Sequence, residues 1–155
     1  MKKRFSYLFW PILALAGGGL SWLFSRKGLA EAYPLLQKSA LTPPDWVFPL
    51  VWSILYILMG LGLAMVLQRN SPDTQGVGAV WFLQLAANLL WSPLFFRWQL
   101  FLAALIDLAV LWLLILAMTA LFARISKTAA LLQIPYLLWV GFAGYLNYVV
   151  WQLNP

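Results

Sequence analysis

The chain contains no cysteine and no histidine among its 155 residues. Without these side chains, disulfides, structural zinc or copper sites and nucleophiles activated by histidine are excluded. Haem held by histidine or cysteine is excluded for the same reason, so we expect no metal site. The absence of cysteine also means that the sequence carries no sign of a redox compartment.

Charge is scarce as well. Only 9% of the residues are charged and only four are acidic, whereas 64% are hydrophobic and the mean hydropathy is +0.85. A soluble domain cannot bury that much apolar surface, but a bilayer removes the need to bury it. The net charge of +6 does not indicate a nucleic-acid partner, because the basic residues lie at the ends of apolar runs rather than on one face.

Five apolar runs are each long enough to cross a bilayer, which takes about 20 residues. The predicted spans are residues 5–24, 46–68, 79–96, 100–122 and 129–151. The first run continues to residue 24, which is long for a signal peptide and indicates a retained helix. We therefore expect an all-α integral membrane protein, a five-transmembrane-helix bundle in one domain, residues 1–155. It is a multi-pass protein surrounded by membrane lipid, and we expect a bacterial membrane.

The longest predicted connection is the loop 25–45, about twice the length of the next one. A long loop over a bundle of antiparallel helices is a typical place for a lid or a binding loop. Its last residues, Pro43, Pro44 and Asp45, indicate a rigid turn into the second helix. We expect the Asp45 carboxylate to cap that helix, where its charge also suits the helix dipole.

Polar and aromatic residues from several spans are predicted to lie in the membrane half beneath this loop. Counting about 1.5 Å per residue from the loop-side ends of the spans places Trp52, Asn88, Trp91 and Asn147 about 6 to 12 Å deep. Trp139 falls near the middle of the last span. Helical spacing also puts Asn88 and Trp91 on one face, and Trp139 and Asn147 roughly on another. A pocket roofed by the loop is the simplest explanation.

Asp107 is the only acid within a span. A central acid costs about 2.5–3.5 kcal/mol on insertion, so its side chain is expected to face the bundle and to have a partner. Its role is either ligand, ion or proton handling, or a structural hydrogen bond. The amides Gln84, Asn88 and Asn147 likewise either line a pocket or join helices. A proton-coupled small transporter using Asp107 and a structural or regulatory membrane protein are therefore alternative functions.

Three sequence segments carry a resemblance to a known family. They read PPDWVFPLVW at 43–52, QLAANLLWSPLFF at 84–96, and PYLLW at 135–139, the last followed by Asn147 and Asn154. At these residues the chain resembles the TspO/MBR family, which contains the tryptophan-rich sensory proteins and the mitochondrial translocator protein, also called the peripheral-type benzodiazepine receptor. The resemblance runs from the long loop to the end of the sequence.

The resemblance implies a five-helix bundle, often a homodimer, with a ligand pocket under the first loop. It implies binding of tetrapyrroles such as protoporphyrin IX or haem, or of sterols and other hydrophobic ligands, for transport or stress signalling, with no cofactor required. The implied ligand-binding residues are Phe48, Trp52, Tyr56, Asn88, Trp91, Trp139, Ala143 and Asn147. A light- and oxygen-dependent breakdown of porphyrin is the enzymatic alternative, in which Trp52 and Trp139 are catalytic.

The loop departs from the family pattern at two positions. Ala32 precedes Tyr33 where the family often has a tryptophan, and Leu41 stands where an aromatic residue is usual. We expect these missing aromatics to change how the lid closes or which ligand it prefers. Tyr33, Lys38 and Arg26 are predicted lid residues or contacts for ligand propionates, since basic side chains bind carboxylates well.

Overall fold

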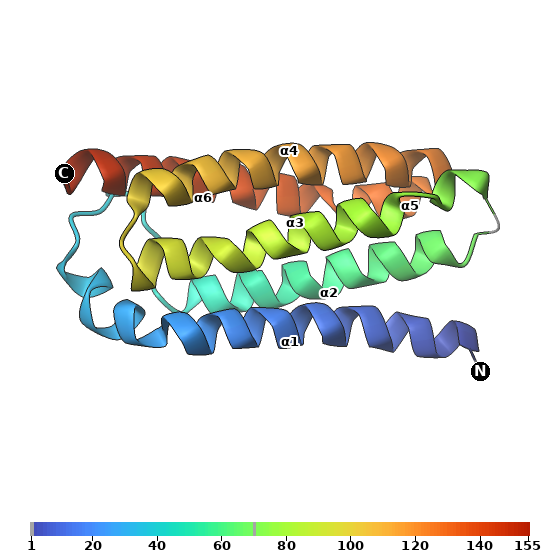
Figure 1. The fold of residues 1–155 in the computed structure, drawn as a ribbon, viewed down its shortest axis with the longest axis horizontal. Coiled ribbons are helices and arrows are strands. Elements are labelled where there is room, and N and C mark those ends of the chain that lie inside the picture. The colour runs from blue at the N-terminus through green and yellow to red at the C-terminus, as the bar shows by residue number, and fades with distance from the viewer. Residues whose placement is uncertain (1, 70) are drawn as a thin grey trace.

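The computed structural model describes residues 2–69 and 71–155, which form a bundle of long helices (Figure 1). The long helices are α1 (Lys2–Glu31), α2 (Val47–Leu67), α3 (Val77–Ser92), α4 (Phe101–Ile125) and α6 (Ile134–Leu153). The short ones are η1 (Tyr33–Leu35), η2 (Pro72–Thr74), the π-helical turn η3 (Pro93–Arg97) and α5 (Lys127–Leu131). The chain is 83% helical and the described residues contain no strand, which confirms the predicted fold class.

Five helical segments are long and apolar enough to cross a membrane. They are Arg4–Glu31, Val47–Leu67, Pro72–Arg97, Phe101–Ile125 and Lys127–Leu153. The N- and C-terminal ends accordingly lie at opposite ends of the bundle (Figure 1). The α1–α2 loop, the α3–α4 turn and the end of α6 gather at one end, which is the arrangement that the predicted site requires.

The first helix is longer than predicted. The sequence interpretation ended it at residue 24, but α1 continues to Glu31, so the loop comprises residues 32–46 rather than 25–45. The added turns are rich in helix-forming residues, and a helix need not end where the membrane ends. At Gly28 this extension meets the π-turn so closely that a Cβ atom there would overlap the Phe96 carbonyl oxygen.

The α3–α4 corner is shaped by Pro93. Proline has no N–H to donate to the Leu89 carbonyl four residues earlier. The hydroxyl of Ser21 on α1 donates to that Leu89 oxygen instead, at 2.7 Å. The chain then forms the π-turn and reverses at Gln99, whose φ of 53° is left-handed. A hydrogen bond from α1 therefore compensates for the proline that bends the chain over the candidate site.

The predicted span 129–151 is not one helix. It is divided between α5 and α6 at residues 132–133, immediately before Pro135. The backbone N–H of Gln133 bonds to the Ala130 carbonyl at 2.9 Å, which leaves the Ala129 carbonyl without its usual helical donor. The Gln133 side chain donates to that Ala129 oxygen and to the Leu58 oxygen of α2, each at 3.2 Å. This break fixes the start of α6 against α2.

The predicted cap by Asp45 is wrong. The residue that precedes α2 is Trp46, and no side chain makes a capping hydrogen bond there. A backbone turn takes its place, with the N–H of Val47 donating to the Pro44 carbonyl at 3.0 Å. The two prolines restrict the preceding backbone and so favour this turn without help from the carboxylate.

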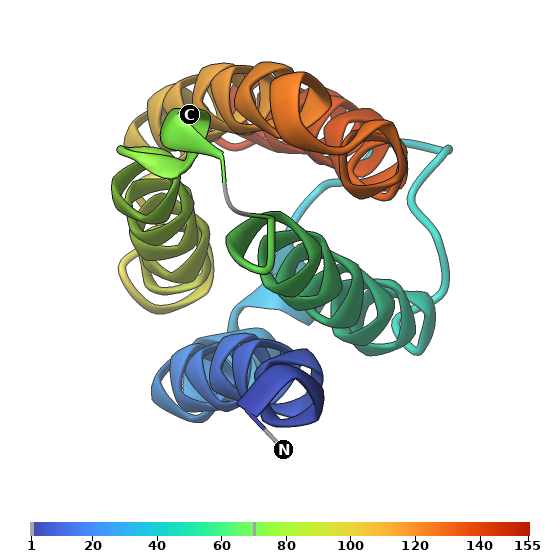
Figure 2. The same ribbon diagram turned by 90° about the vertical axis from the view of Figure 1, so that its right-hand side faces the viewer.

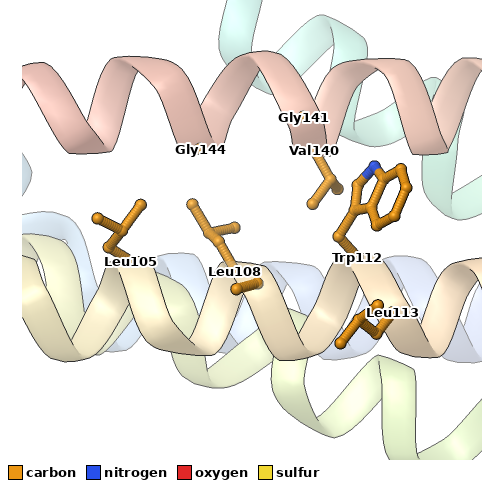
Figure 3. A pocket seen from close by; sticks show the side chains of 8 residues that line it. Leu105, Leu108, Trp112, Leu113, Val140, Gly141 and Gly144 are labelled. Carbon is orange, nitrogen blue, oxygen red and sulfur yellow. The ribbon is translucent and has the colours of Figure 1, made fainter.

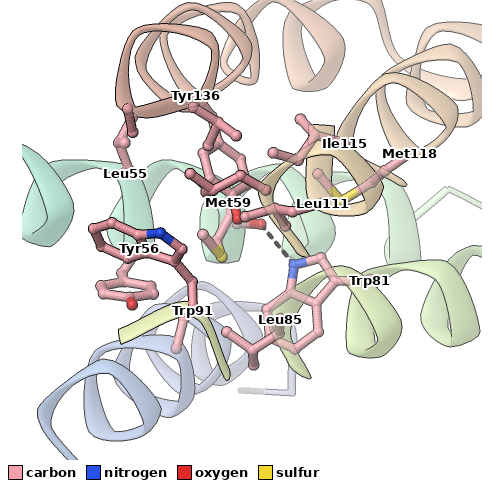
Figure 4. Packing of buried hydrophobic residues seen from close by; sticks show 14 of the residues in the cluster. Leu55, Tyr56, Met59, Trp81, Leu85, Trp91, Leu111, Ile115, Met118 and Tyr136 are labelled. Atoms are coloured by element: carbon pink, nitrogen blue, oxygen red, sulfur yellow. Dashed lines mark hydrogen bonds between the residues drawn. The ribbon is translucent and has the colours of Figure 1, made fainter. Parts of the chain in front are cut away.

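The core lies between α2, α3, α4 and α6 (Figures 2 and 4). Large side chains that are almost completely buried include Leu55, Met59, Trp81, Leu111, Ile115, Met118 and Tyr136. The Trp81 indole N–H donates to the Met59 carbonyl at 3.1 Å, so this tryptophan joins α3 to α2 (Figure 4). Few polar residues are buried among the described residues; Ser25, Asn88 and Asn147 lie toward the loop, and Ser126 and Gln133 lie at the other end of the bundle.

Candidate functional site

A small cavity lies under the α1–α2 loop. It is lined by Tyr33, Lys38 and Thr42 of the loop, Phe48 of α2, Trp91, Phe95 and Phe96 of the α3–α4 corner, and Ala143, Leu146, Asn147 and Val150 of α6. Its volume is about 20 Å³, enough for about one water molecule. The cavity lies under the loop and is nearly closed. Of the eight residues predicted to bind ligand, four line it (Phe48, Trp91, Ala143 and Asn147) and four do not (Trp52, Tyr56, Asn88 and Trp139).

Tyr33 lines this cavity from the loop side and packs on the aromatic rings of the α3–α4 corner. Its side chain is only 8% exposed, and its ring centre lies 5.3 Å from that of Phe96 and 6.3 Å from that of Phe95. Burial, with a smaller contribution from the negative charge of Asp45, raises the pKa of Tyr33 from 10.0 to about 12. The phenol is therefore neutral at physiological pH, and it acts as an uncharged plug.

Below the cavity, a chain of side-chain hydrogen bonds links three helices. The Tyr56 hydroxyl on α2 donates to Asn88 Oδ1 on α3 at 2.7 Å, and Asn88 Nδ2 donates to the Tyr136 hydroxyl on α6 at 2.6 Å. Tyr136 in turn donates to Gln84 Oε1 at 2.7 Å. All four side chains are buried. Asn88 and Gln84 thus join helices, which is one of the two roles left open by the sequence.

A second pair joins the corner to α6. The Trp91 indole N–H donates to Asn147 Oδ1 at 3.0 Å, and Asn147 Nδ2 donates to the Phe101 carbonyl at 2.8 Å. Both Trp91 and Asn147 also line the cavity, as does the buried Ala143. An asparagine amide has further hydrogen-bonding capacity beyond these two bonds. Asn147 therefore both fixes the wall and presents a polar edge to the cavity.

Trp52 and Trp139 lie outside the lining of the cavity and have different neighbours. The Trp52 ring lies 6.0 Å from those of Tyr56 and Trp91, whereas Trp139 packs edge-on against Phe48 at 5.8 Å. Among the described residues, these two tryptophans make no ring contact with each other. The Trp139 Nε1 atom is buried and has no hydrogen-bond acceptor in the described part of the chain. An unpaired buried donor costs about 1–3 kcal/mol, so this N–H is available to a ligand acceptor.

Three basic residues near the loop end of the bundle, the predicted Lys38 and Arg26 and the neighbouring Arg97, differ in their contacts. Lys38 Nζ turns inward, donates to the Tyr33 carbonyl at 3.0 Å and lies 4.2 Å from the centre of the Tyr33 ring. Arg97 donates to the Phe24 carbonyl at 3.0 Å and stacks on the Phe24 ring. Arg26 is exposed on α1. Lys38 therefore holds the lid in this conformation, and only Arg26 of the predicted contacts extends into the surroundings.

Asp107 lies on α4 and is partly buried. Contrary to expectation, its Oδ2 atom is buried with no hydrogen-bond partner among the described residues. The sequence predicted a partner because an unpaired acid in a membrane is costly. Among the described residues no side chain supplies that bond, so of the two roles left open for Asp107, the structural hydrogen bond is not seen in this conformation.

A larger hollow lies elsewhere, between α4 and α6 (Figure 3). Its volume is about 440 Å³, and its lining is Leu105, Leu108, Ala109, Trp112, Leu113, Val140, Gly141 and Gly144. The Trp112 N–H already donates to the Leu137 carbonyl at 3.1 Å, so the hollow presents no free polar group from that ring. None of the residues predicted to bind ligand lines it. The converging polar groups favour the cavity under the loop.

Tyr136 is the main functional candidate that the sequence interpretation did not single out. It belongs to the PYLLW segment and stands three residues before Trp139, so helical spacing puts both on one side of α6. Its ring lies 6.4 Å from Trp52. Helical spacing places Phe95 on the face of Asn88 and Trp91, and Phe95 lines the cavity. Phe96 was not singled out, because its place at the cavity depends on the π-turn, which no spacing rule predicts.

The fold and site define a multi-pass membrane protein with an aromatic cavity beneath its first loop. The sequence profile of the TspO/MBR family matches residues 9–152. The chain is 47% identical to the tryptophan-rich protein TspO of Chlorobaculum tepidum over 145 residues, 92% of each chain. It is 40% identical to protein CrtK of Rhodobacter capsulatus over 126 residues, 79% of this chain and 78% of that one.

The similarity extends to animals. Over 146 residues, 92% of this chain and 86% of the relative, it is 36% identical to the translocator protein of Bos taurus. The chain belongs to the TspO/MBR family. Because relatives occur in both bacteria and mammals, family membership establishes a membrane protein but not the bacterial membrane that we expected.

Proposed function

We propose that this protein binds flat hydrophobic ligands, with tetrapyrroles such as protoporphyrin IX as the main class, for transport or stress signalling. The observation that carries the proposal is the aromatic cavity under the loop, whose wall includes Trp91, Phe48 and the amide of Asn147. Indole and phenyl faces stack on planar ligands. The names of the relatives, a sensory protein and a translocator protein, agree with this function.

The ligand must displace the lid. Pockets for small molecules usually measure about 300–1,000 Å³, and the closed cavity of about 20 Å³ has no room for a macrocycle. Withdrawal of Tyr33 opens the space between Phe48, Trp91 and Ala143. In the proposed complex, the free Trp139 N–H donates to a ligand acceptor, and Arg26 or a released Lys38 binds a carboxylate at the mouth. No additional cofactor is required.

Titration of the purified protein with protoporphyrin IX, followed by the Soret band, tests the proposal. The Trp52→Phe/Trp139→Phe variant removes two indoles from the site. The Trp22→Phe/Trp112→Phe variant removes two indoles that are exposed outside it and serves as a matched control. We expect saturable binding that is weakened in the first variant and retained in the second.

The same titration can contradict the proposal in two ways. Absence of saturable binding to the parent protein would reject tetrapyrroles as the ligand class. If porphyrin binding is weakened only in the Trp22→Phe/Trp112→Phe variant, the ligand binds instead at the hollow between α4 and α6, which Trp112 lines. The homodimer implied by the family resemblance stays a prediction, to be measured by light scattering of the detergent-solubilised protein.

A second candidate function is proton-coupled transport through Asp107. The observation that favours it is the buried Asp107 Oδ2 atom, which has no hydrogen-bond partner in the part of the chain that the structure describes. Acids inside a membrane commonly mark proton pathways. Uptake by proteoliposomes should then depend on pH in the parent protein and lose that dependence in Asp107→Asn. Unchanged uptake in this isosteric variant would reject the candidate.

A further inference from the structure

The α1–α2 loop is tied to the end of α6 by a side chain that pairs with both backbone groups of one loop residue. Asn154 Oδ1 accepts from the Gln37 N–H at 3.0 Å, and Asn154 Nδ2 donates to the Gln37 carbonyl at 2.9 Å. Two bonds of opposite direction to one residue fix both the position and the orientation of the loop at that point. A third bond, between the hydroxyls of Ser39 and Tyr145 at 3.2 Å, lies close by.

The Asn154 amide is itself held in place. Its Nδ2 atom also donates at 2.8 Å to the Val150 carbonyl, which accepts the Asn154 backbone N–H at 3.0 Å as well. Turning the amide over would place its oxygen against two carbonyl oxygens, so the hydrogen-bond network determines its orientation. The loop is thus anchored to a rigid helix end.

The anchored residue is next to the one that holds the plug. Lys38 follows Gln37 directly in the sequence. The Lys38 ammonium group donates to the Tyr33 carbonyl and also contacts the Tyr33 ring. Tyr33 is buried and lines the cavity, whose volume is only about 20 Å³. The contacts therefore run without a gap from the end of α6, through Gln37 and Lys38, to the side chain that blocks the site.

We propose that Asn154 is a latch that keeps the ligand site closed by its own loop, and that ligand entry requires the Asn154–Gln37 pair to open. The identity of the ligand rests on the function proposed above, but the latch does not. A ligand that needs the open state binds with an affinity reduced by the fraction of open protein. Weakening the latch therefore speeds ligand association and raises apparent affinity.

The absence of cysteine from the chain permits a test without any porphyrin. Ala143→Cys places a single thiol on the cavity wall, at a position that is 4% exposed in the closed state. Its rate of reaction with a water-soluble maleimide reports how often the lid opens. In this background, Asn154→Ala removes the latch, and Gln152→Ala is the matched control, since Gln152 is exposed on the same helix end.

We expect Asn154→Ala to react about tenfold faster than its parent, as the loss of its two exposed hydrogen bonds to Gln37 implies. Gln152→Ala should react at the parental rate. Ser39→Ala removes the bond to the Tyr145 hydroxyl and the one that Ser39 Oγ accepts from the Leu41 N–H, but it leaves the end of α6 intact. It should react about two- to threefold faster. Hydrogen exchange at the Gln37 amide should accelerate in Asn154→Ala as well, because that N–H loses its acceptor.

Equal labelling rates in Asn154→Ala and its parent would overturn the proposal. Equal acceleration in Gln152→Ala would overturn it too, because it would indicate a general loosening of α6. Asn154→Asp keeps the size of the side chain but replaces its donor with an oxygen that repels two carbonyls, so slow labelling of that variant would likewise count against a latch. If labelling accelerates as expected but no porphyrin binds, the latch stands and the proposed ligand fails.

Discussion

Removing one hydroxyl from Tyr136 should break the central polar connection of the bundle. Tyr136→Phe keeps the ring in its completely buried position and deletes only the oxygen. That oxygen accepts from Asn88 at 2.6 Å and donates to Gln84 at 2.7 Å, so two interhelical hydrogen bonds are lost together. Both remaining partners are buried and cannot turn to water.

The magnitude follows from the count of bonds. In soluble proteins, each buried group left unpaired costs about 1–3 kcal/mol. Hydrogen bonds between membrane helices contribute less, about 0.6 kcal/mol on average and about 1.7 at most, because the unfolded chain in the membrane also finds partners. The membrane value applies here, so Tyr136→Phe should lower the free energy of unfolding by about 1–3 kcal/mol.

Two other tyrosines provide a graded series with the same chemical change. Tyr56→Phe deletes one hydrogen bond of the same chain, the one to Asn88, and should cost about half as much as Tyr136→Phe. Tyr148→Phe changes an exposed ring whose hydroxyl makes no hydrogen bond to the described residues, and should cost nothing measurable. Because Tyr56 and Tyr136 share Asn88, the double variant should fall short of the sum of the two single effects.

Equilibrium unfolding in mixed micelles of mild detergent and dodecyl sulfate measures these differences. We expect Tyr136→Phe to be the most destabilised variant, Tyr56→Phe to be intermediate, and Tyr148→Phe to be as stable as the parent protein. If Tyr136→Phe and Tyr148→Phe unfold alike, the polar chain does not stabilise the bundle, and the reasoning from buried hydrogen bonds is refuted. An effect of Tyr56→Phe larger than that of Tyr136→Phe would contradict the count of bonds.

Three further predictions concern the corner, the plug and the tryptophans. Gly28→Ala should destabilise the bundle by about 1–3 kcal/mol, because its Cβ overlaps the Phe96 carbonyl, while Gly19→Ala in open space should not; thermal unfolding separates the two. Burial raises the pKa of Tyr33 to about 12, so its contribution to lid closure is fully present below about pH 10 and is lost as the pH rises through about 12. Labelling of the cavity thiol, normalised to a free thiol, should therefore be flat below about pH 10 and rise above it; a rise near neutral pH would contradict this. Under the porphyrin-breakdown alternative, illuminating the complex should yield a new absorbing product in the parent and none in Trp52→Phe/Trp139→Phe; an inert parent would exclude that alternative.

The sequence predicted the spans well because their signal is simple. Length and apolar composition decide whether a segment can cross a bilayer, and α2 begins and ends within one residue of its predicted bounds. Helical spacing also assigned Asn88 and Trp91 to one side of α3, and both are buried. These inferences depend only on local periodicity, which the sequence contains directly.

The wrong predictions concern features that depend on contacts between residues distant in the sequence. The extension of α1 to Glu31 packs Gly28 against the π-turn near Phe96, and neither feature follows from composition. The break before α6 depends on the Gln133 side chain reaching Leu58 on another helix. Asp107 was given a partner on energetic grounds alone, and energetic cost does not identify which neighbour supplies a hydrogen bond.

The site has two parts, a floor of buried helical side chains and a roof formed by the α1–α2 loop. Different kinds of interaction hold these two parts, and the two missing aromatic residues belong to the loop. The floor is a set of buried hydrogen bonds between α2, α3 and α6, centred on Asn88 and Tyr136. The roof is held by partly exposed bonds at Asn154 and by one buried ring, Tyr33. Solvent competes for exposed bonds, so the roof opens at a smaller cost than the floor.

Ala32 and Leu41 both belong to this weaker part. Leu41 is 65% exposed and Ala32 precedes the plug, so neither side chain takes part in the floor. Restoring aromatic residues at these two positions should then change how long a ligand stays, through the dissociation rate, while leaving the stability of the bundle unaltered. A loss of bundle stability in Ala32→Trp or Leu41→Phe would show that roof and floor are coupled, and that the loop supports the fold as well as covering the site.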